Sequence, residues 1–253
     1  MRLTDTHCHL IDEKYTQTPD ELIAEWKENN GGHMFVIGTD VYTSCEIAKI
    51  ANKYQDIHAI VGIHPEYAQN VTKEDLQTIE NLAKDATAIG EIGLDFYYGK
   101  EYKDVQIAVF KAQLDIAKRL NKPICIHTRE AMELTINILK EYPEVKGVIH
   151  CFSGSKESAK TLVKMGYLIG VGGIATFKNG RQILETISEI GLKNIVLETD
   201  APYLTPEPFR GKTNKPMYVK FVAQKVAEIL NLPLDIVLQE TEKNAKFIYK
   251  IEN

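Results

Sequence analysis

The chain has 253 residues, of which 44% are hydrophobic and 26% are charged, and its formal net charge is −5. This balance is ordinary for a globular protein. It excludes a protein that coats nucleic acid through a broad basic surface, although a small site for one or two phosphates is compatible with it. The sequence has no apolar run of roughly 18 residues that would cross a membrane, no apolar core of a signal peptide, and no CxxC pair among its four cysteines. We therefore expect a cytoplasmic protein without disulfides.

The predicted elements alternate along the whole chain. Short runs rich in aliphatic and β-branched residues are followed by longer segments whose apolar residues are spaced by three and four. In chain order, the predicted strands are Leu3–Thr6, Met34–Ile37, Ile57–Gly62, Ala86–Ile92, Pro123–Ile126, Gly147–His150, Leu168–Val171 and Asn194–Glu198. The predicted helices include Asp20–Asn30, Glu46–Tyr54, Lys103–Leu120, Lys156–Met165, Gln182–Ile190, about Met217–Leu230, and Leu234–Ile248.

Eight strands that are each followed by a segment long enough for a crossover helix are typical of a parallel (β/α)8 barrel, the TIM barrel. No linker or low-complexity tract divides the chain, so we predict a single α/β domain over residues 1–253. A doubly wound open sheet is the main alternative. Such a sheet usually carries a glycine-rich phosphate turn after its first strand, where this chain has His7-Cys8-His9.

Side chains that can bind metal stand where five of the predicted strands end. Asp5, within the first strand, and His7 and His9, at its carboxyl end, alternate by two, so on an extended backbone all three point to the same side. The carboxyl ends of the strands form the catalytic face of a TIM barrel, where such side chains converge. Burying them without partners is costly, and metal ions are natural partners. The predicted ligands are His7, His9, Glu91, His127, His150 and Asp200.

Other histidines and cysteines receive a plainer interpretation. A single histidine near a strand is more often a hydrogen-bonded structural residue than a ligand, and we place His33 and His58 in that class. Cys8, Cys125 and Cys151 adjoin ligand positions. We expect strand alternation to turn all three outward, as small residues of the core.

Five motifs resemble those of the TatD family, the TatD-like deoxyribonucleases of the amidohydrolase superfamily. They are Asp5-Thr6-His7-Cys8-His9-Leu10, Gly62-Ile63-His64-Pro65, Gly90-Glu91-Ile92-Gly93-Leu94-Asp95, His150-Cys151-Phe152-Ser153-Gly154 and Glu198-Thr199-Asp200-Ala201-Pro202-Tyr203-Leu204. The motifs follow the family's order and extend over almost the whole chain. The resemblance implies a TIM barrel and a divalent-metal hydrolase that cleaves phosphodiester bonds of DNA.

The resemblance also implies how the six ligands divide between two ions: one takes His7, His9 and Asp200, the other takes His127 and His150, and Glu91 bridges them. Mixed nitrogen and oxygen ligands suit Zn, Mn, Fe or Co, and Mg is less typical beside four imidazoles. Two divalent cations and two carboxylates leave a charge of about +2 for hydroxide and a substrate anion. An acidic protein can therefore bind a phosphodiester at one positive spot.

Two-metal chemistry suggests the catalytic roles. A water activated by the two ions attacks phosphorus in line. Asp200 touches a metal and can accept the proton of that water, so we assign it as the general base, and Glu91 takes part as the bridge. Glu198 has the same parity as Asp200 along the strand and is expected to orient the nucleophile or a ligand. A salt bridge at the rim of the barrel is the alternative for Glu198.

Two further residues are candidates for binding the substrate. His64 ends the third strand, and Pro65 turns the chain into a loop there. We interpret His64 as a phosphate contact, with a simple loop hydrogen bond as the alternative. Arg129, two residues after His127, can hold a phosphate oxygen or pair with Glu130 or another surface acid.

The segment after the last strand, residues 201–216, is rich in proline and carries Arg210, Lys212 and Lys215 against Glu207 alone. It can guide a nucleic acid or be an ordinary solvated loop. With the resemblance, these features predict a deoxyribonuclease, an exonuclease acting on single strands or strand ends of DNA. We expect a monomer without a membrane partner.

Two other functions are open on the sequence alone. An amidohydrolase-type enzyme with the same barrel would cleave a small ester, lactone or amide, or the ester that joins an amino acid to tRNA. Many such enzymes bridge their metals with a carboxylated lysine after strand 4, where this chain has Glu91. The other possibility is a non-catalytic barrel that binds metal or a partner protein, against which the complete set of ligands argues.

Overall fold

The structure, a computed structural model, describes residues 2–251. Within this range, eight parallel strands form one sheet in which each strand pairs with the next along the chain. The strands are β1 Leu3–Cys8, β2 Gly31–Ile37, β3 Ile57–Val61, β4 Ala88–Asp95, β5 Ile124–Arg129, β6 Gly147–Ile149, β7 Leu168–Val171 and β8 Ile195–Leu197.

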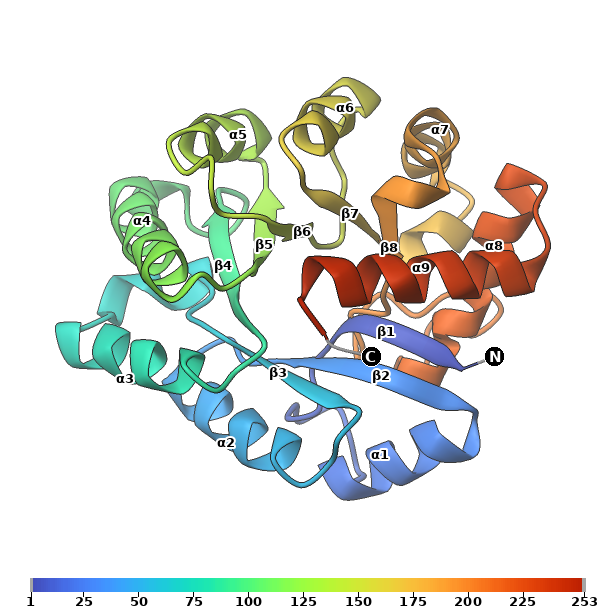
Figure 1. The fold of residues 1–253 in the computed structure, drawn as a ribbon, viewed down its shortest axis with the longest axis horizontal. Coiled ribbons are helices and arrows are strands. Elements are labelled where there is room, and N and C mark those ends of the chain that lie inside the picture. Colours follow the sequence, from blue (N-terminus) through green and yellow to red (C-terminus); the bar gives the residue numbers. More distant parts are fainter. Residues whose placement is uncertain (1, 252–253) are drawn as a thin grey trace.

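The sheet curves until its first and last strands meet (Figure 1). At this seam the His9 amide donates to the Ala201 carbonyl at 2.7 Å, and the Asp200 amide donates to the His7 carbonyl at 2.9 Å. The predicted (β/α)8 barrel is confirmed. Its closure also fixes the backbone of three predicted metal ligands.

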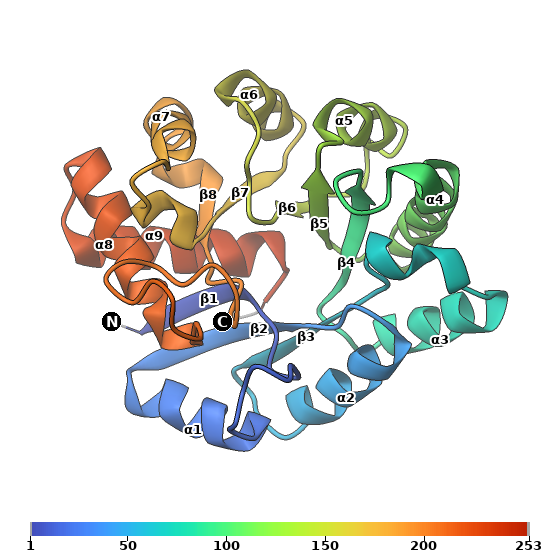
Figure 2. The ribbon, with the colours of Figure 1, turned by 180° about the vertical axis from the view of Figure 1, so that it is seen from behind.

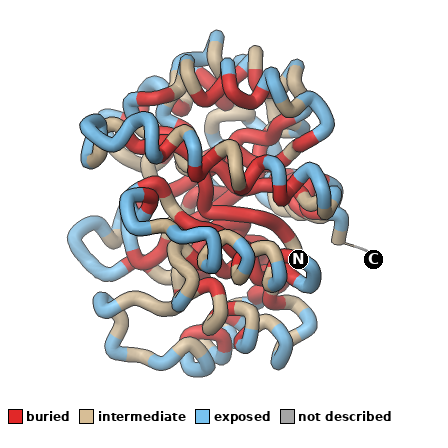
Figure 3. The backbone as a smooth tube through the Cα atoms, turned by 90° about the vertical axis from the view of Figure 1, so that its left-hand side faces the viewer, coloured by how far each residue is buried: buried red, intermediate tan, exposed pale blue. Residues whose placement is uncertain are grey.

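Helices surround the barrel and connect its strands (Figures 1 and 2). They are α1 Pro19–Glu28, α2 Val41–Ala51, α3 Lys73–Ala83, α4 Lys103–Leu120, α5 Met132–Lys140, α6 Lys156–Lys164, α7 Arg181–Ile190, α8 Val219–Leu230 and α9 Leu234–Ile248. Short 3-10 turns are η1 Pro65–Asn70, η2 Lys100–Tyr102, η3 Gly173–Thr176, η4 Leu192–Asn194 and η5 Pro216–Tyr218. Aliphatic side chains fill the layer between strands and helices, and buried residues follow the strands and the inner helix faces (Figure 3).

The helix ends depend on capping. α4 and α9 have the predicted bounds, whereas α2 begins at Val41 instead of the predicted Glu46. The Asp40 side chain accepts a hydrogen bond from the Thr43 amide at 2.7 Å, and this cap starts the helix earlier than its apolar spacing indicates. Within residues 2–251, no helix is both long enough and apolar enough to cross a membrane.

The two ends of the barrel are built differently. Helix α9 crosses the amino-terminal end, the near side in Figure 1, where Ala245, Ile248 and the following Tyr249 pack against Phe35 and Val148 inside the barrel. Figure 2 shows the opposite face, where the connections after β1 and β8 lie. The strands end on that face, and the predicted site residues lie there.

The orientation predicted for Cys125 is wrong. It packs inside the barrel, and its Sγ lies 3.3 Å from His7 Nδ1. Cys125 is two residues before His127 on β5, so alternation places both on the inner side. Cys8 packs in the outer core, as predicted. Cys151 follows β6 with a φ of 44°, where strand alternation no longer applies.

Candidate active site

Glu91, near the carboxyl end of β4, is the centre of a buried cluster of imidazoles. Its Oε2 lies 3.4 Å from His7 Nε2 and 3.8 Å from His9 Nε2. Its Oε1 lies 2.9 Å from His127 Nδ1 and 3.1 Å from His150 Nε2. The two oxygens of one carboxylate therefore face two different pairs of histidines.

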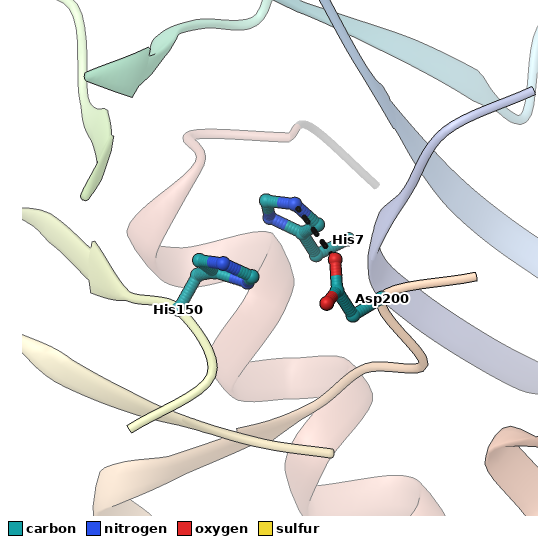
Figure 4. A group of neighbouring side chains, drawn as sticks. All are labelled: His7, His150 and Asp200. Atoms are coloured by element: carbon teal, nitrogen blue, oxygen red, sulfur yellow. Dashed lines mark ion pairs between the residues drawn. The ribbon is translucent and has the colours of Figure 1, made fainter. Parts of the chain in front are cut away.

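Asp200 joins the first of these groups. Its Oδ1 lies 3.7 Å from His7 Nε2 and 3.5 Å from His9 Nε2. Figure 4 shows this carboxylate beside His7 and the ring of His150, whose centroid is 3.6 Å from that of His7. The structure thus brings all six predicted ligands together. Three sets have ligand atoms within 4.8 Å of one another and can hold a metal: His7, His150 and Asp200; His7, His9 and Glu91; and His64, Glu91 and His127.

Carboxylates stand behind two of the histidines. His127 Nε2 lies 3.0 Å from Asp95 Oδ2, on the side of the ring away from the cluster. His150 Nδ1 lies 3.4 Å from Glu198 Oε1. A proton on each of these outer nitrogens leaves the lone pair of the inner nitrogen pointing at the cluster, as a metal ligand requires.

Glu198 is fully buried, which excludes a salt bridge at the rim of the barrel. Its Oε1 also accepts a hydrogen bond from the Cys151 amide at 2.5 Å. A Cβ atom at Gly170 would lie 2.5 Å from Glu198 Oε2, so the glycine on β7 leaves room for this carboxylate. Glu198 therefore lies behind His150 and contacts the ligand shell from inside the barrel.

Asp5 ties the end of β1 to the segment after β8. Its carboxylate accepts hydrogen bonds from the Thr199 amide at 3.0 Å, the Thr199 hydroxyl at 2.6 Å and the His7 amide at 3.2 Å. The side chain is fully buried. Asp5 therefore fixes the backbone beside His7 and Asp200 and does not itself face the cleft.

Electrostatics keep Glu91 ionised. Burial alone would raise the pKa of its carboxyl, but the charge of His150, the nearby His7 and the hydrogen bond to His127 outweigh burial and hold the pKa well below its usual range. For His150, burial lowers the pKa, yet Glu91 and Glu198 outweigh it and raise the pKa well above that of a free imidazole. A proton and a metal cation therefore compete for His150 Nε2, the ring nitrogen that faces Glu91.

A family model described as TatD related DNase matches residues 4–250. The chain belongs to the TatD family. It is 40% identical to the uncharacterized metal-dependent hydrolase YabD of Bacillus subtilis, over 98% of this chain and 99% of that one. It is 32% identical to the uncharacterized metal-dependent hydrolase YcfH of Escherichia coli, over 100% of this chain and 97% of that one. Membership makes this chain a metal-dependent hydrolase, as the ligand cluster also indicates.

Solved structures agree with this placement. The TatD homolog YJJV of Escherichia coli superposes with a TM-score of 0.91 at 27% identity, over 99% of both chains. A TatD family hydrolase of Entamoeba histolytica superposes with a TM-score of 0.86 at 21% identity, over 98% of both chains, which concerns the fold alone. The TatD fold therefore extends over essentially the whole chain.

In this TatD-family site, His64 is placed differently from the other histidines. Its Nδ1 accepts a hydrogen bond from the Glu66 amide at 3.2 Å, and its Nε2 lies 3.6 Å from Glu91 Oε1. Burial and the charge of His127 lower the pKa of His64 to about 3, so the ring is neutral. Because Nδ1 accepts, Nε2 carries the proton. His64 therefore presents an N–H donor to the cluster.

The basic side chains that were candidates for contacting the substrate are engaged with other groups of the protein. The Arg129 guanidinium lies over the Tyr97 ring, 3.9 Å from its centroid. In the loop after β8, Lys215 Nζ is 2.7 Å from a Glu25 carboxylate oxygen. Arg210 lies over the Phe177 ring, 3.9 Å from its centroid, and donates to a backbone carbonyl. Lys215 and Arg210 are therefore both engaged with neighbouring groups of the protein.

The cluster opens into a cleft of about 520 Å³. The cleft is bounded by the connections after β1, β2, β3 and β8, and none of its described lining residues is lysine or arginine. Four carboxylates line it away from the cluster, together with two tyrosines: Asp12, Glu13, Asp40, Glu66, Tyr67 and Tyr203. Positive charge for a substrate anion therefore has to come from the cluster itself.

Three features of the site were not predicted from the sequence: the position of Asp95, the position of Cys125 and the acidic side of the cleft. Asp95 has the same strand parity as Glu91, and that parity is the signal by which its position behind His127 was predictable. Cys125, two residues before His127, could have been placed near His7 by the same reasoning. No pattern in the sequence indicates the acidic side of the cleft, because its members come from separate loops.

Proposed function

We propose that this TatD-family hydrolase is a deoxyribonuclease that holds two divalent ions and removes nucleotides from single strands or strand ends. The observation that carries the proposal is the position of Glu91, whose Oε2 faces His7 and whose Oε1 faces His127 and His150. A carboxylate with its oxygens turned to two ligand sets suits a bridge between two ions. The family's description as TatD related DNase supports the choice of DNA.

The residues fit such ions. The first set offers His7, His9, Asp200 and one oxygen of Glu91, and the second offers His127, His150 and the other oxygen. This mixture of imidazole and carboxylate suits Zn, Mn, Fe or Co. When bound, two such ions supply charge neutralisation of a phosphodiester and a lowered pKa of water.

The side chains of the protein complete the chemistry. Asp200 is assigned as the general base, since its carboxylate borders the cleft. Burial raises the pKa of this carboxyl, but the hydrogen bond to His9 outweighs burial and lowers the pKa. The carboxylate is therefore ionised and can accept a proton. His64 donates its Nε2 proton to a phosphate oxygen. Glu198 keeps His150 oriented. Arg129 lies over Tyr97, so it contacts the substrate only where the DNA strand extends beyond the cleft.

The test is elemental analysis of the purified protein combined with a nuclease assay before and after chelation. We expect up to two divalent ions per chain, cleavage of a single-stranded oligonucleotide, and loss of both on chelation with recovery on reconstitution. His127→Ala should empty mainly one of the two sites. A protein that takes up no Zn or Mn, or that holds metal and cleaves no oligonucleotide, contradicts the proposal.

A second function has one observation in its favour. The cleft offers no lysine or arginine among its described lining residues, which suits a small ester, lactone or amide, or an aminoacyl ester, as well as a strand end. Brisk hydrolysis of such a compound by a metal-loaded protein that leaves every oligonucleotide intact would establish this alternative.

A further inference from the structure

The cleft beside the metal cluster has a marked charge pattern. Asp12, Glu13, Asp40 and Glu66 line it, and no lysine or arginine does so within the described residues. Lys14, which follows Glu13 in the chain, places its Nζ 3.7 Å from the centroid of the Tyr203 ring. Phosphate groups brought into this cleft would meet several carboxylates at short range. Only a phosphate at the metal cluster would find compensation.

The carboxylates converge on one side of the cleft. Asp40, Glu66 and Tyr67 line the same cleft, and the two carboxylates add to the effect of burial in raising the pKa of the Tyr67 hydroxyl. Asp12 Oδ2 accepts a hydrogen bond from the Tyr203 hydroxyl at 2.5 Å. These acidic groups and tyrosines line one cleft outside the metal cluster, and we call them the acidic wall: Asp12, Glu13, Asp40, Glu66, Tyr67 and Tyr203.

Both rings are partly exposed, and Lys14 lies over one face of the Tyr203 ring, so Tyr67 is the ring offered for stacking. Tyr67 is 46% exposed and Tyr203 is 39% exposed. An aromatic face of this kind accepts any base without reading its sequence. A cleft of about 520 Å³ is of the size that takes one small organic molecule. Carboxylates accept hydrogen bonds from sugar hydroxyls but repel phosphate.

We infer that the acidic wall is a subsite for one uncharged terminal nucleoside, and that it selects strand ends with a free hydroxyl over ends that carry a phosphate. This inference rests on the proposed deoxyribonuclease function and specifies its substrate. The scissile phosphate lies at the metal cluster, and the terminal sugar and base lie against the wall. The rest of the strand leaves the cleft on another side.

The experiment uses the metal-loaded full chain and three dithymidine dinucleotides: one with both ends free, one with a 5′-phosphate and one with a 3′-phosphate. One of the two phosphorylated dinucleotides should be cleaved with a kcat/KM at least about tenfold lower than the unphosphorylated one, because its phosphate enters the wall. Cleavage of all three within threefold overturns the inference.

Neutralising carboxylates of the acidic wall tests whether they cause the discrimination against a terminal phosphate. The triple variant Glu13→Gln, Asp40→Asn and Glu66→Gln should cleave the unphosphorylated dinucleotide and the disfavoured phosphorylated one with nearly equal kcat/KM values. Asn at position 40 can still accept the Thr43 amide and so preserves the start of α2. The matched control is Glu28→Gln, which removes an exposed carboxylate at the carboxyl-terminal end of α1 and should keep the wild-type ratio. A triple variant that still discriminates fully overturns the inference.

Stacking is tested separately by binding. Tyr67→Ala should raise the Kd of a non-hydrolysable phosphorothioate dinucleotide about tenfold, and Tyr67→Phe should restore it. Tyr42, which is 66% exposed and does not line the cleft, is the control position. An unchanged Kd in Tyr67→Ala counts against the stacking surface.

Two further results separate this inference from the proposed function. Cleavage of long single strands without cleavage of any dinucleotide overturns the subsite and leaves the deoxyribonuclease standing. Absence of cleavage of every nucleic acid overturns both. Faster hydrolysis of an aminoacyl adenosine than of the dinucleotide also overturns the inference, since the wall would then bind an ammonium group.

Discussion

The two ends of the barrel both hold histidines, and they use them in opposite ways. At the carboxyl-terminal end, five imidazoles face Glu91, and carboxylates stand behind two of them. At the amino-terminal end, His33 Nδ1 and His58 Nε2 are 2.8 Å apart, and a carboxylate oxygen of Glu242 is 3.9 Å from His33. The first arrangement converges on a common point, whereas the second is a single hydrogen bond between neighbouring strands.

The difference shows what separates a ligand histidine from a structural one. His33 and His58 satisfy each other, and burial lowers the pKa of His58 to about 4, so that it is uncharged at neutral pH. Among the histidines around Glu91, His127 has its outer nitrogen bonded to Asp95, and His150 has its outer nitrogen 3.4 Å from Glu198, while the inner nitrogens of both are directed at the same oxygen of Glu91. Orientation by a second group, more than the presence of the imidazole, distinguishes the two ends.

The largest effect is expected at the shared carboxylate. Glu91→Gln removes the charge that faces both sets of histidines, and we expect kcat/KM to fall roughly 1,000-fold, about 4 kcal/mol of transition-state stabilisation. Metal content by elemental analysis should fall in parallel. Glu242→Gln at the opposite end is the matched control and should stay within about twofold. Equal effects of the two changes would remove the distinction between the ends.

A smaller loss is expected at the proposed general base. Asp200→Asn should lower kcat by at least roughly 100-fold, the low end for a lost proton acceptor. The measurement is turnover of a single-stranded oligonucleotide in single-turnover conditions, with bound metal quantified in the same sample. Near-normal turnover would transfer the role to another group in the cleft.

The carboxylates behind the histidines come next. Asp95→Asn and Glu198→Gln should each weaken metal binding by about 10- to 100-fold, because the ring they orient loses its fixed tautomer. Competition with a chelator of known affinity measures this. Asp56→Asn, near the His33–His58 pair, should leave metal affinity as it is. An unchanged affinity in Asp95→Asn would mean that His127 is held by the backbone alone.

The smallest effect concerns stability at the other end. His58 has a lowered pKa in the folded state, so below about pH 6.5 the unfolded chain takes up a proton that the folded chain refuses until about pH 4. Stability is therefore lost as the pH falls through this window, by about 2 kcal/mol after allowance for partial exposure. His58→Gln should remove this part of the pH dependence in urea unfolding at pH 7 and pH 4.5. The same slope in both proteins would contradict the account.

The barrel and the ligand set were predictable from the sequence because both depend on local patterns. Alternating strand and helix periods predict the (β/α)8 order, and strand parity places His7 with His9 on one side of β1 and His127 on the inner side of β5. Glu91 faces inward although Ile89, of the same parity, packs in the outer core, because the register of β4 shifts between Ile89 and Ile92. The same rule, applied consistently, would have placed Cys125 inside the barrel and Asp95 behind His127.

By itself, then, the sequence determined the fold, the edge of the barrel that carries the cluster and the identity of the six converging side chains. The family resemblance implied the division of these side chains into two groups, and only the tertiary structure decided which oxygen of Glu91 faces which group, because that depends on the curvature that brings β1 next to the segment after β8. It also decided that Lys215 is paired with Glu25 and that the cleft is acidic. Residues from separate loops meet there through chain closure over long distances, and no local period in a sequence records such a meeting.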